Sequence, residues 1–464
     1  MNKYFKRIIA FLCFLLMFAT AACGGKNTTS ESGEGTPVIT EKLTSQPVYS
    51  KYYDYLGGKN VMPIGTYGGP QISQLTDEFF TLFKECGIGF FSSTVDGSND
   101  KANAEKFLDL CDEYEIGTFL TMSSIRGHNV AAVMTTEKLE TALSEFAGHE
   151  SFMGFELQDE PTVAQTVTLN KTVKAFEASR YAYLDMYYNA LPDYAEPTSL
   201  SGSIDYGITF EEYCRGYIEN LEATYFSYDY YPFGKYGTIS QNYITCMATV
   251  RNVCEDMGVP FWTYIQCGAD FGYGLKECIP DEDRFRWNVA TCLAYGAKGI
   301  QYFTLSQWSG FYDAIKDNDP EAETRVGMIG AKNNINQWYY YAKDANAHIA
   351  AVDSILMNAT NMGVIFNGTS PVKQSTGREV ITSEKFRQLI AVEGSSALVG
   401  CFDYKGGTAL YVVNNSVTKK GTIRLDFDNN YYYLVTQKTV TTEKTGRSLE
   451  LSLDKGEGVL VVLR

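Results

Sequence analysis

The feature that most limits the fold of this chain is an alternation between short apolar runs and longer segments of helical period, which occupies residues 61–304. Each run is long enough for one strand, and enough residues follow it for a covering helix. Eight such runs occur, at 61–66, 88–93, 116–122, 152–161, 181–191, 223–230, 260–267 and 299–304. Eight strand and helix units in about 250 residues are what a (β/α)₈ barrel requires, so the pattern predicts an α/β fold of the TIM-barrel type.

The segments between the runs carry the marks of helices. In residues 71–86, apolar side chains recur at helical spacing and Gly87 follows the last of them. Residues 101–114 show the same period, and Thr209 with Glu212 forms a capping-box pattern at the start of another helix. The alternative architecture is an open doubly wound sheet, which we disfavour because no Gly-x-Gly-x-x-Gly turn follows the first run.

The last third of the chain has a different pattern. Residues 334–356 have the period of one long helix, which we expect to cover part of the barrel, and we interpret His348 on its apolar face as a packing residue. Farther on, apolar and polar residues alternate in short runs, most clearly at 422–427, with turn residues between the runs. The predicted domains are therefore a barrel at 51–356 and a small C-terminal antiparallel β-sandwich at 357–464.

Residues 1–23 have the form of a secretory signal peptide. Basic residues precede the apolar run 8–18, and the small residues 20–22 stand directly before Cys23. A cysteine in this position resembles the lipobox of bacterial lipoproteins, which implies that Cys23 carries lipid and anchors the protein at the extracellular face of the bacterial cell membrane. The alternative is an ordinary cleaved signal with an incidental cysteine. Residues 24–50, rich in Gly, Ser, Thr and Glu, are expected to form a flexible tether.

Charge and cysteine content exclude several classes of function. The formal net charge of −16 disfavours nucleic-acid partners, which need clustered Lys and Arg. Nine of the 11 cysteines lie beyond Cys23, an odd number with no Cys-x-x-Cys pair, so we expect small buried hydrophobes and not a disulfide framework. The three histidines form no metal-ligand spacing. We therefore expect neither a metal nor a cofactor.

Polar side chains close many of the predicted strands, and in a (β/α)₈ barrel the active site lies at that end. They are Tyr67 after the first, Asp159 and Glu160 after the fourth, Asn189 at the fifth, Asp229 and Tyr231 after the sixth, Gln266 at the seventh and Trp308 after the eighth. A proton donor, a second carboxylate and aromatic platforms are the equipment for hydrolysing a glycosidic bond. The alternative for the sequence Asp159-Glu160-Pro161 is a helix start, with both acids near the positive end of the helix dipole.

The fourth run also carries a family resemblance. Its sequence, Phe-Met-Gly-Phe-Glu-Leu-Gln-Asp-Glu-Pro, resembles the fourth-strand motif of the clan A glycoside hydrolases, in which Asn or Asp precedes the acid/base glutamate. Residues 188–192, 227–232 and 294–300 are similar to segments of barrel glycosidases of the beta-galactosidase and agarase groups. The resemblance implies that Glu160 is the general acid/base and that Asp159 stands where the family has a sugar-binding Asn.

The chain departs from this family at the seventh strand. Retaining clan A enzymes have the nucleophilic glutamate at its end, where this chain has Gln266, which cannot form a glycosyl ester. Three explanations are open: Asp229 or Asp270 supplies the second carboxylate, the enzyme inverts with a more distant base, or the barrel binds sugar without cleaving it. We favour Asp229 because it ends an apolar strand run, whereas Asp270 lies in a glycine-rich segment.

The leading hypothesis is therefore a lipid-anchored glycosidase acting on an oligo- or polysaccharide. Glu160 and Asp229 are its predicted catalytic residues. The predicted substrate-binding residues are Asp159, Tyr67, Asn189, Tyr231, Gln266 and Trp308. The alternative hypotheses are a non-catalytic carbohydrate-binding lipoprotein on a degenerate barrel, motivated by Gln266, and a purely structural envelope protein, which gives no reason for so many polar strand ends.

Overall fold

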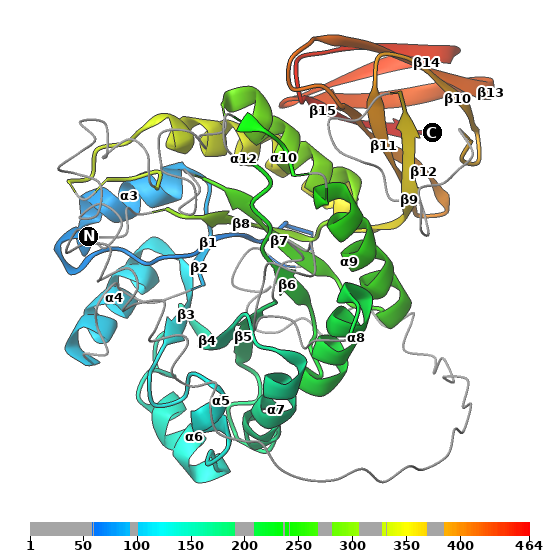
Figure 1. Ribbon diagram of the computed structural model, residues 1–464. Coiled ribbons are helices and arrows are strands. Elements are labelled where there is room, and N and C mark those ends of the chain that lie inside the picture. The colour runs from blue at the N-terminus through cyan, green and yellow to red at the C-terminus, as the bar shows by residue number, and fades with distance from the viewer. Residues whose placement is uncertain are drawn as a thin grey trace, which may run out of the picture. The chain divides into compact units, whose positions relative to one another are not determined.

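Eight parallel strands form a closed barrel, as the sequence predicted (Figure 1). The computed structural model describes residues 58, 60–92, 101–190, 208–234, 237–240, 242–267, 281–305, 327–330, 332–368 and 385–464. The barrel strands are β1 (Ile64–Thr66), β2 (Phe90–Phe91), β3 (Gly117–Thr121), β4 (Phe152–Asp159), β5 (Asp185–Asn189), β6 (Phe226–Tyr228), β7 (Phe261–Gln266) and β8 (Gly299–Phe303). They pair in the order β5-β4-β3-β2-β1-β8-β7-β6, and a parallel bridge between Ala190 and Tyr228 closes the circle. All their carboxyl ends therefore lie at one mouth of the barrel.

Helices follow the strands and cover the barrel from outside (Figure 1). They are η2 (Ile72–Gln74), α3 (Asp77–Glu85), α4 (Lys101–Tyr114), α5 (His128–Ala131), α6 (Thr136–Ser144), α7 (Val163–Glu177), α8 (Phe210–Leu221), α9 (Tyr243–Met257), α10 (Glu282–Ala294) and α12 (Gln337–Leu356). The predicted capping box is confirmed, since Thr209 caps α8 and Glu212 reaches back to it. Within the described ranges, no helix combines the length and apolar character that crossing a membrane requires.

The helix-start interpretation of Asp159-Glu160-Pro161 is not what the structure has. Asp159 is the last residue of β4, and α7 begins only at Val163, with Thr162 as its N-cap in a capping box with Gln165. The two acids therefore stand at a strand end, ahead of the first helical turn.

Large side chains fill the amino-terminal half of the barrel interior. This floor cluster consists of Phe90, Phe119, Met153, Tyr187, Tyr225 and Trp262, and all are buried. Tyr225 stacks on Trp262 with ring centroids 4.3 Å apart. The interior is closed at this level, as in barrels whose core is packed by side chains, so the polar mouth lies at the other end of a solid core.

The C-terminal region is antiparallel. Its strands are β9 (Ala359–Asn367), β10 (Leu389–Gly394), β11 (Ala397–Tyr404), β12 (Gly407–Asn414), β13 (Gly421–Gln437), β14 (Val440–Leu453) and β15 (Gly458–Leu463). The long β13 pairs with β10 through its first half and with β15 through its second half, so one curled sheet provides both layers of a sandwich. A separate apolar cluster that includes Phe427, Val412 and Val461 fills the space within it. The predicted fold class is confirmed.

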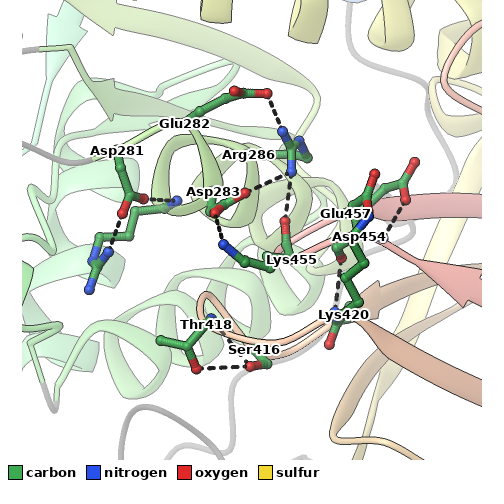
Figure 2. Close-up of polar contacts among 12 residues, drawn as sticks. Asp281, Glu282, Asp283, Arg286, Ser416, Thr418, Lys420, Asp454, Lys455 and Glu457 are labelled. Atoms are coloured by element: carbon green, nitrogen blue, oxygen red, sulfur yellow. Dashed lines mark hydrogen bonds and ion pairs between the residues drawn. The ribbon is translucent and has the colours of Figure 1, made fainter.

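Charged residues of α10 contact the turn before β15 at the junction of barrel and sandwich (Figure 2). The Arg286 guanidinium donates to the Lys455 carbonyl oxygen at 2.8 Å, and the Lys455 ammonium lies 2.8 Å from the Asp283 carboxylate. Beneath them the buried Trp287 indole donates to Asn415 Oδ1 at 2.9 Å. The junction therefore has an apolar interior with an ionic rim.

His348 of α12 also belongs to this junction. Its Nδ1 donates to the Lys438 carbonyl oxygen at 2.6 Å, and its Nε2 lies 2.8 Å from the Tyr411 hydroxyl. Burial lowers the pKa of the imidazole. The residue predicted as packing thus also links the long helix to the sandwich by hydrogen bonds.

Gly400 of β11 provides a test of this junction. A methyl group at Gly400 would lie 2.1 Å from the Ala294 carbonyl oxygen at the end of α10, and backbone cannot move aside like a flexible side chain. We expect Gly400→Ala to lower the free energy of unfolding by about 3 kcal/mol, an overpacking cost, measured by urea denaturation. Gly148→Ala, where nothing lies within 4 Å, is the matched control and should be neutral or slightly stabilising. Equal stability of the two variants would contradict tight docking of β11 on α10.

The cysteines of the described ranges confirm the predicted packing role. Cys86, Cys111, Cys214, Cys246, Cys254, Cys267, Cys292 and Cys401 are all free and buried. Burial raises the pKa of the Cys86 thiol to about 12, which makes it inert at neutral pH.

Candidate active site

Three predicted residues meet at the barrel mouth. Asp159 ends β4, Asn189 ends β5 and Asp229 directly follows β6. The Asn189 amide donates to Asp159 Oδ1 at 3.2 Å and to Asp229 Oδ1 at 3.1 Å, so one side chain bridges both acids. Asn189 and Asp229 are nearly fully buried, with exposed fractions of 4% and 6%.

Glu160 lies beside this group with an unusual backbone. Its φ of 48° is in the left-handed region, which non-glycine residues rarely adopt, and its N–H donates to the Asn189 carbonyl oxygen at 2.8 Å. The Glu160 carboxyl shares a hydrogen bond with the Asp229 carboxyl. Its side chain keeps exposed surface, whereas Asp229 is enclosed. The strained backbone thus brings the Glu160 carboxyl close to Asp229. Residues with such strained backbones are often found at functional sites.

The two paired carboxyls differ in acidity. Partial burial, which removes water from the carboxyl, is the main reason that the pKa of Glu160 is raised to about 9. The negative charges of Asp229 and Asp159 also contribute to this rise. Burial raises the pKa of Asp229 less, to about 7, because hydrogen bonds from Tyr231 and Asn189 stabilise its carboxylate. Exposed surface on Glu160 makes the rise in its pKa smaller in solvent, but the hydrogen bonds from Tyr231 and Asn189 keep Asp229 the stronger acid of the two. Asp229 therefore ionises before Glu160, and the shared proton resides on Glu160 at neutral pH.

Glu156, within β4, is a candidate site residue that the sequence did not predict. It is fully buried, its Oε1 lies 2.9 Å from the Arg126 guanidinium and its Oε2 accepts a hydrogen bond from the Thr121 hydroxyl. Burial, partly offset by Arg126, raises the pKa of Glu156 to about 7. A carboxylate inside an apolar run, and a lone arginine soon after the third strand, were the only signals for this pair.

Tyr67, predicted to bind substrate, lies next to the Glu156–Arg126 pair. The Arg126 guanidinium donates a hydrogen bond to the Tyr67 hydroxyl, and the Tyr67 ring lies 5.7 Å from the Phe303 ring. Burial and the nearby carboxylates of Glu156 and Asp159 raise the phenol pKa well above its usual value. The half-buried phenol is therefore neutral and supplies an aromatic wall to the mouth.

Gln266 and Tyr231 lie on the β6 and β7 side of the mouth. The buried Gln266 amide contacts the backbone of Phe233 through both of its polar atoms. The Tyr231 ring lies 5.1 Å from the Phe303 ring, at the end of β8. Trp308 and Cys23, as well as the alternative carboxylate Asp270, lie outside the described residues.

A polar layer beneath the mouth connects these side chains to the floor cluster. The Ser227 hydroxyl donates to Asn189 Oδ1 at 3.0 Å and accepts from Gln301 Nε2 at 2.9 Å. The Tyr187 hydroxyl donates to Gln301 Oε1 at 2.8 Å and lies 2.6 Å from the Tyr264 hydroxyl. Because Asn189 has its oxygen fixed from below, its amide nitrogen must face the two aspartates.

The geometry resembles that of an acid–base dyad. A directly hydrogen-bonded pair is closer than the roughly 5 Å of retaining glycosidases or the more than about 6.5 Å of inverting ones. The exposed Glu160 has room to move, whereas Asp229 is held by Asn189 and Tyr231. Entry of a ligand oxygen between the carboxyls would therefore displace Glu160. No group of three or more metal-binding side chains occurs in the described ranges.

Comparisons with known proteins give similarities of structure only. No protein-family model matches the sequence, and no curated protein is similar in sequence. A β-galactosidase from the psychrophilic Marinomonas ef1 matches with a TM-score of 0.45 and 11% identity, over 64% of this chain and 62% of that one.

Two further solved structures match over different shares of the chain. A GH27 β-L-arabinopyranosidase from Geobacillus stearothermophilus matches with a TM-score of 0.48 and 10% identity, over 89% of this chain and 98% of that one. The GH99 endo-α-mannosidase from Bacteroides thetaiotaomicron matches with a TM-score of 0.37 and 12% identity, over 59% and 77%. Similarities this low do not define the activity of the chain.

Proposed function

We propose that this protein is a glycoside hydrolase in which Glu160 is the general acid/base and Asp229 the second carboxylate. The observation that carries the proposal is the pair itself: two hydrogen-bonded carboxyls at the barrel mouth, with Asp229 ionising before Glu160. When the pKa values of two neighbouring carboxyls differ, the one with the higher pKa can act as the acid and the one with the lower pKa as the base or nucleophile. Tyr67 and Tyr231 flank the pair and can contact a sugar ring.

In the proposed reaction, the sugar enters between the two carboxyls with its glycosidic oxygen toward Glu160, which protonates that oxygen as the bond to the anomeric carbon breaks. From the opposite face of the sugar, Asp229 either attacks the anomeric carbon, forming a glycosyl ester that water later hydrolyses, or deprotonates the water molecule that attacks it. Asn189 and Tyr231 keep Asp229 ionised and fixed. The distance between the Glu160 and Asp229 carboxyls when substrate is bound would determine whether the reaction retains or inverts the anomeric configuration.

The experiment that tests the proposal is a glycan panel scored for both products and binding. Purified protein without residues 1–23 is incubated with plant, microbial and host polysaccharides, and reducing ends are counted. Sugar release that is lost in Asp229→Asn supports the proposal. Binding without release from any glycan would instead support the non-catalytic carbohydrate-binding alternative, which is motivated by Gln266 at the usual nucleophile position.

We also propose that the protein is anchored at the extracellular face of the cell membrane through lipid on Cys23. The signal-like residues 1–23 and the position of Cys23 support this. A bacterial host expressing the chain should incorporate labelled palmitate into it, and Cys23→Ala should release unlabelled protein into the medium. Equal labelling of both forms would exclude the anchor.

The pH dependence of turnover follows from the two pKa values. Activity requires ionised Asp229, with a pKa of about 7, and protonated Glu160, with a pKa of about 9. The rate should therefore fall below about pH 7 as Asp229 gains a proton and above about pH 9 as Glu160 loses one. The measurement is kcat/KM from pH 5 to 10, which reports the free enzyme. A maximum near pH 5 would contradict these roles.

A further inference from the structure

The loop that follows β6 is fixed to the end of β7 by one side chain. The Phe233 N–H donates to Gln266 Oε1 at 3.0 Å, and Gln266 Nε2 donates to the Phe233 carbonyl oxygen at 3.2 Å. Gln266 is 3% exposed. The amide therefore pairs with both polar groups of one backbone residue, as a neighbouring strand would.

The same loop carries the contacts that stabilise ionised Asp229. Tyr231 stands two residues after Asp229 and two before Phe233, and its hydroxyl donates a hydrogen bond to the Asp229 carboxylate. The Tyr231 ring rests on Phe303. The position of Phe233 therefore determines whether the Tyr231 hydroxyl can hydrogen-bond to Asp229.

We propose that Gln266 is a positioning residue of the hydrolase: by holding Phe233, it places the Tyr231 hydroxyl on Asp229. This inference rests on the proposed function. It also explains an amide at this position, because an amide both accepts and donates, whereas an ionised carboxylate only accepts. A glutamate here would leave the Phe233 carbonyl oxygen without its donor and would add a buried charge at the end of β7.

Other charged groups act on Asp229 but do not depend on Gln266. Asp159 at the end of β4 and Glu160 directly after it face Asp229, and the neutral Asn189 amide donates to it from β5. Arg126 and Glu156 compensate each other on the β3 and β4 side of the mouth. Loss of Gln266 should therefore change the acidity of Asp229 through Tyr231 and leave these other groups in place.

The test compares Gln266→Ala with Tyr231→Phe, which removes the hydroxyl and leaves the Phe233 contacts in place. Both should raise the acid-limb pKa of kcat/KM by about one pH unit, the effect of one lost hydrogen bond to a carboxylate. Only Gln266→Ala should also lower the midpoint of thermal unfolding. An unshifted acid limb in a folded Gln266→Ala protein would overturn the proposal.

A third variant and a measurement that needs no substrate complete the test. Gln266→Glu should resemble Gln266→Ala; a gain in turnover would mean that the position serves a nucleophile, and the positioning role would be wrong. The infrared band of protonated Asp229, identified by its loss in Asp229→Asn, titrates without any substrate. If the wild type releases no sugar from any glycan, the proposed function fails, while the band shift in Gln266→Ala still decides whether Gln266 positions Tyr231.

Discussion

Replacing Glu160 by glutamine is expected to lower kcat by about 10²- to 10⁴-fold, the usual contribution of a general acid. Glutamine has nearly the same shape but no proton to give to the leaving oxygen, so bond cleavage loses its assistance while the binding surface is kept. Saccharide affinity, measured by calorimetry, should change little. The loss should be smaller for aryl glycosides with acidic phenols, because such leaving groups depart without protonation.

The matched control is Glu113→Gln, an exposed glutamate of α4. It makes the same chemical change away from the mouth and should leave kcat unchanged. Two results would count against Glu160 as the acid: full turnover in Glu160→Gln, or an equal loss for aryl glycosides and natural saccharides. The second would point to a positioning effect on Asp229, whose carboxyl shares a hydrogen bond with Glu160.

The barrel could be predicted because its rules are local and repeat. Residues 101–114 have one helical period and form α4 with the predicted ends. Parallel strands bring their carboxyl ends to one mouth, so placing Asp159, Asn189 and Asp229 at strand ends was enough to predict that they meet. Neither step requires knowledge of side-chain conformation.

The Glu156–Arg126 pair could not be predicted in this way. Strict alternation along β4 puts Met153 and Glu156 on opposite faces, yet Met153 belongs to the floor cluster and Glu156 also faces the interior. Gly154 allows this, because its φ of 145° and the register shift beside it insert one extra residue. A methyl group there would lie 1.7 Å from the Asp185 carbonyl oxygen. Such a bulge leaves no periodic signal.

The contact between Gln266 and Phe233, on which its proposed role rests, could not be predicted from the sequence either. Its position at a strand end suggested a substrate contact, which stays a prediction. In the structure, the Gln266 amide forms two hydrogen bonds with the backbone of Phe233 in the loop after β6. Contacts between two strand-end loops depend on how each loop bends, and the spacing of residues does not record that bend.

Removing Arg126 is expected to give the largest loss of stability among single changes at the mouth. Arg126→Met leaves Glu156, whose side chain is 1% exposed, without its counter-ion. Breaking a fully buried pair costs about 3–5 kcal/mol. Because the Arg126 side chain is 34% exposed and solvent screens part of the attraction, we expect about 2–3 kcal/mol at pH 8, measured by urea denaturation.

The loss should depend on pH in a defined direction. Burial holds the pKa of Glu156 at about 7 even beside Arg126, above its ordinary value of 4.5. The folded state therefore binds more protons than the unfolded state, and stability falls as pH rises from 4.5 to the folded pKa. Without Arg126 that pKa rises further, so the fall continues to higher pH. The deficit of Arg126→Met relative to wild type should be small near pH 5 and grow above pH 7.

Two variants separate this effect from lost packing. The double variant Arg126→Met/Glu156→Gln removes both charges, and its deficit relative to wild type should lose the rise above pH 7, since residue 156 can no longer ionise. Arg424→Met breaks a more exposed pair with Asp426 and should cost less than about 1 kcal/mol. If Arg126→Met were as stable as wild type at pH 8, or if its deficit were the same at pH 5 and pH 8, Arg126 would not be the group that keeps Glu156 ionised next to Tyr67.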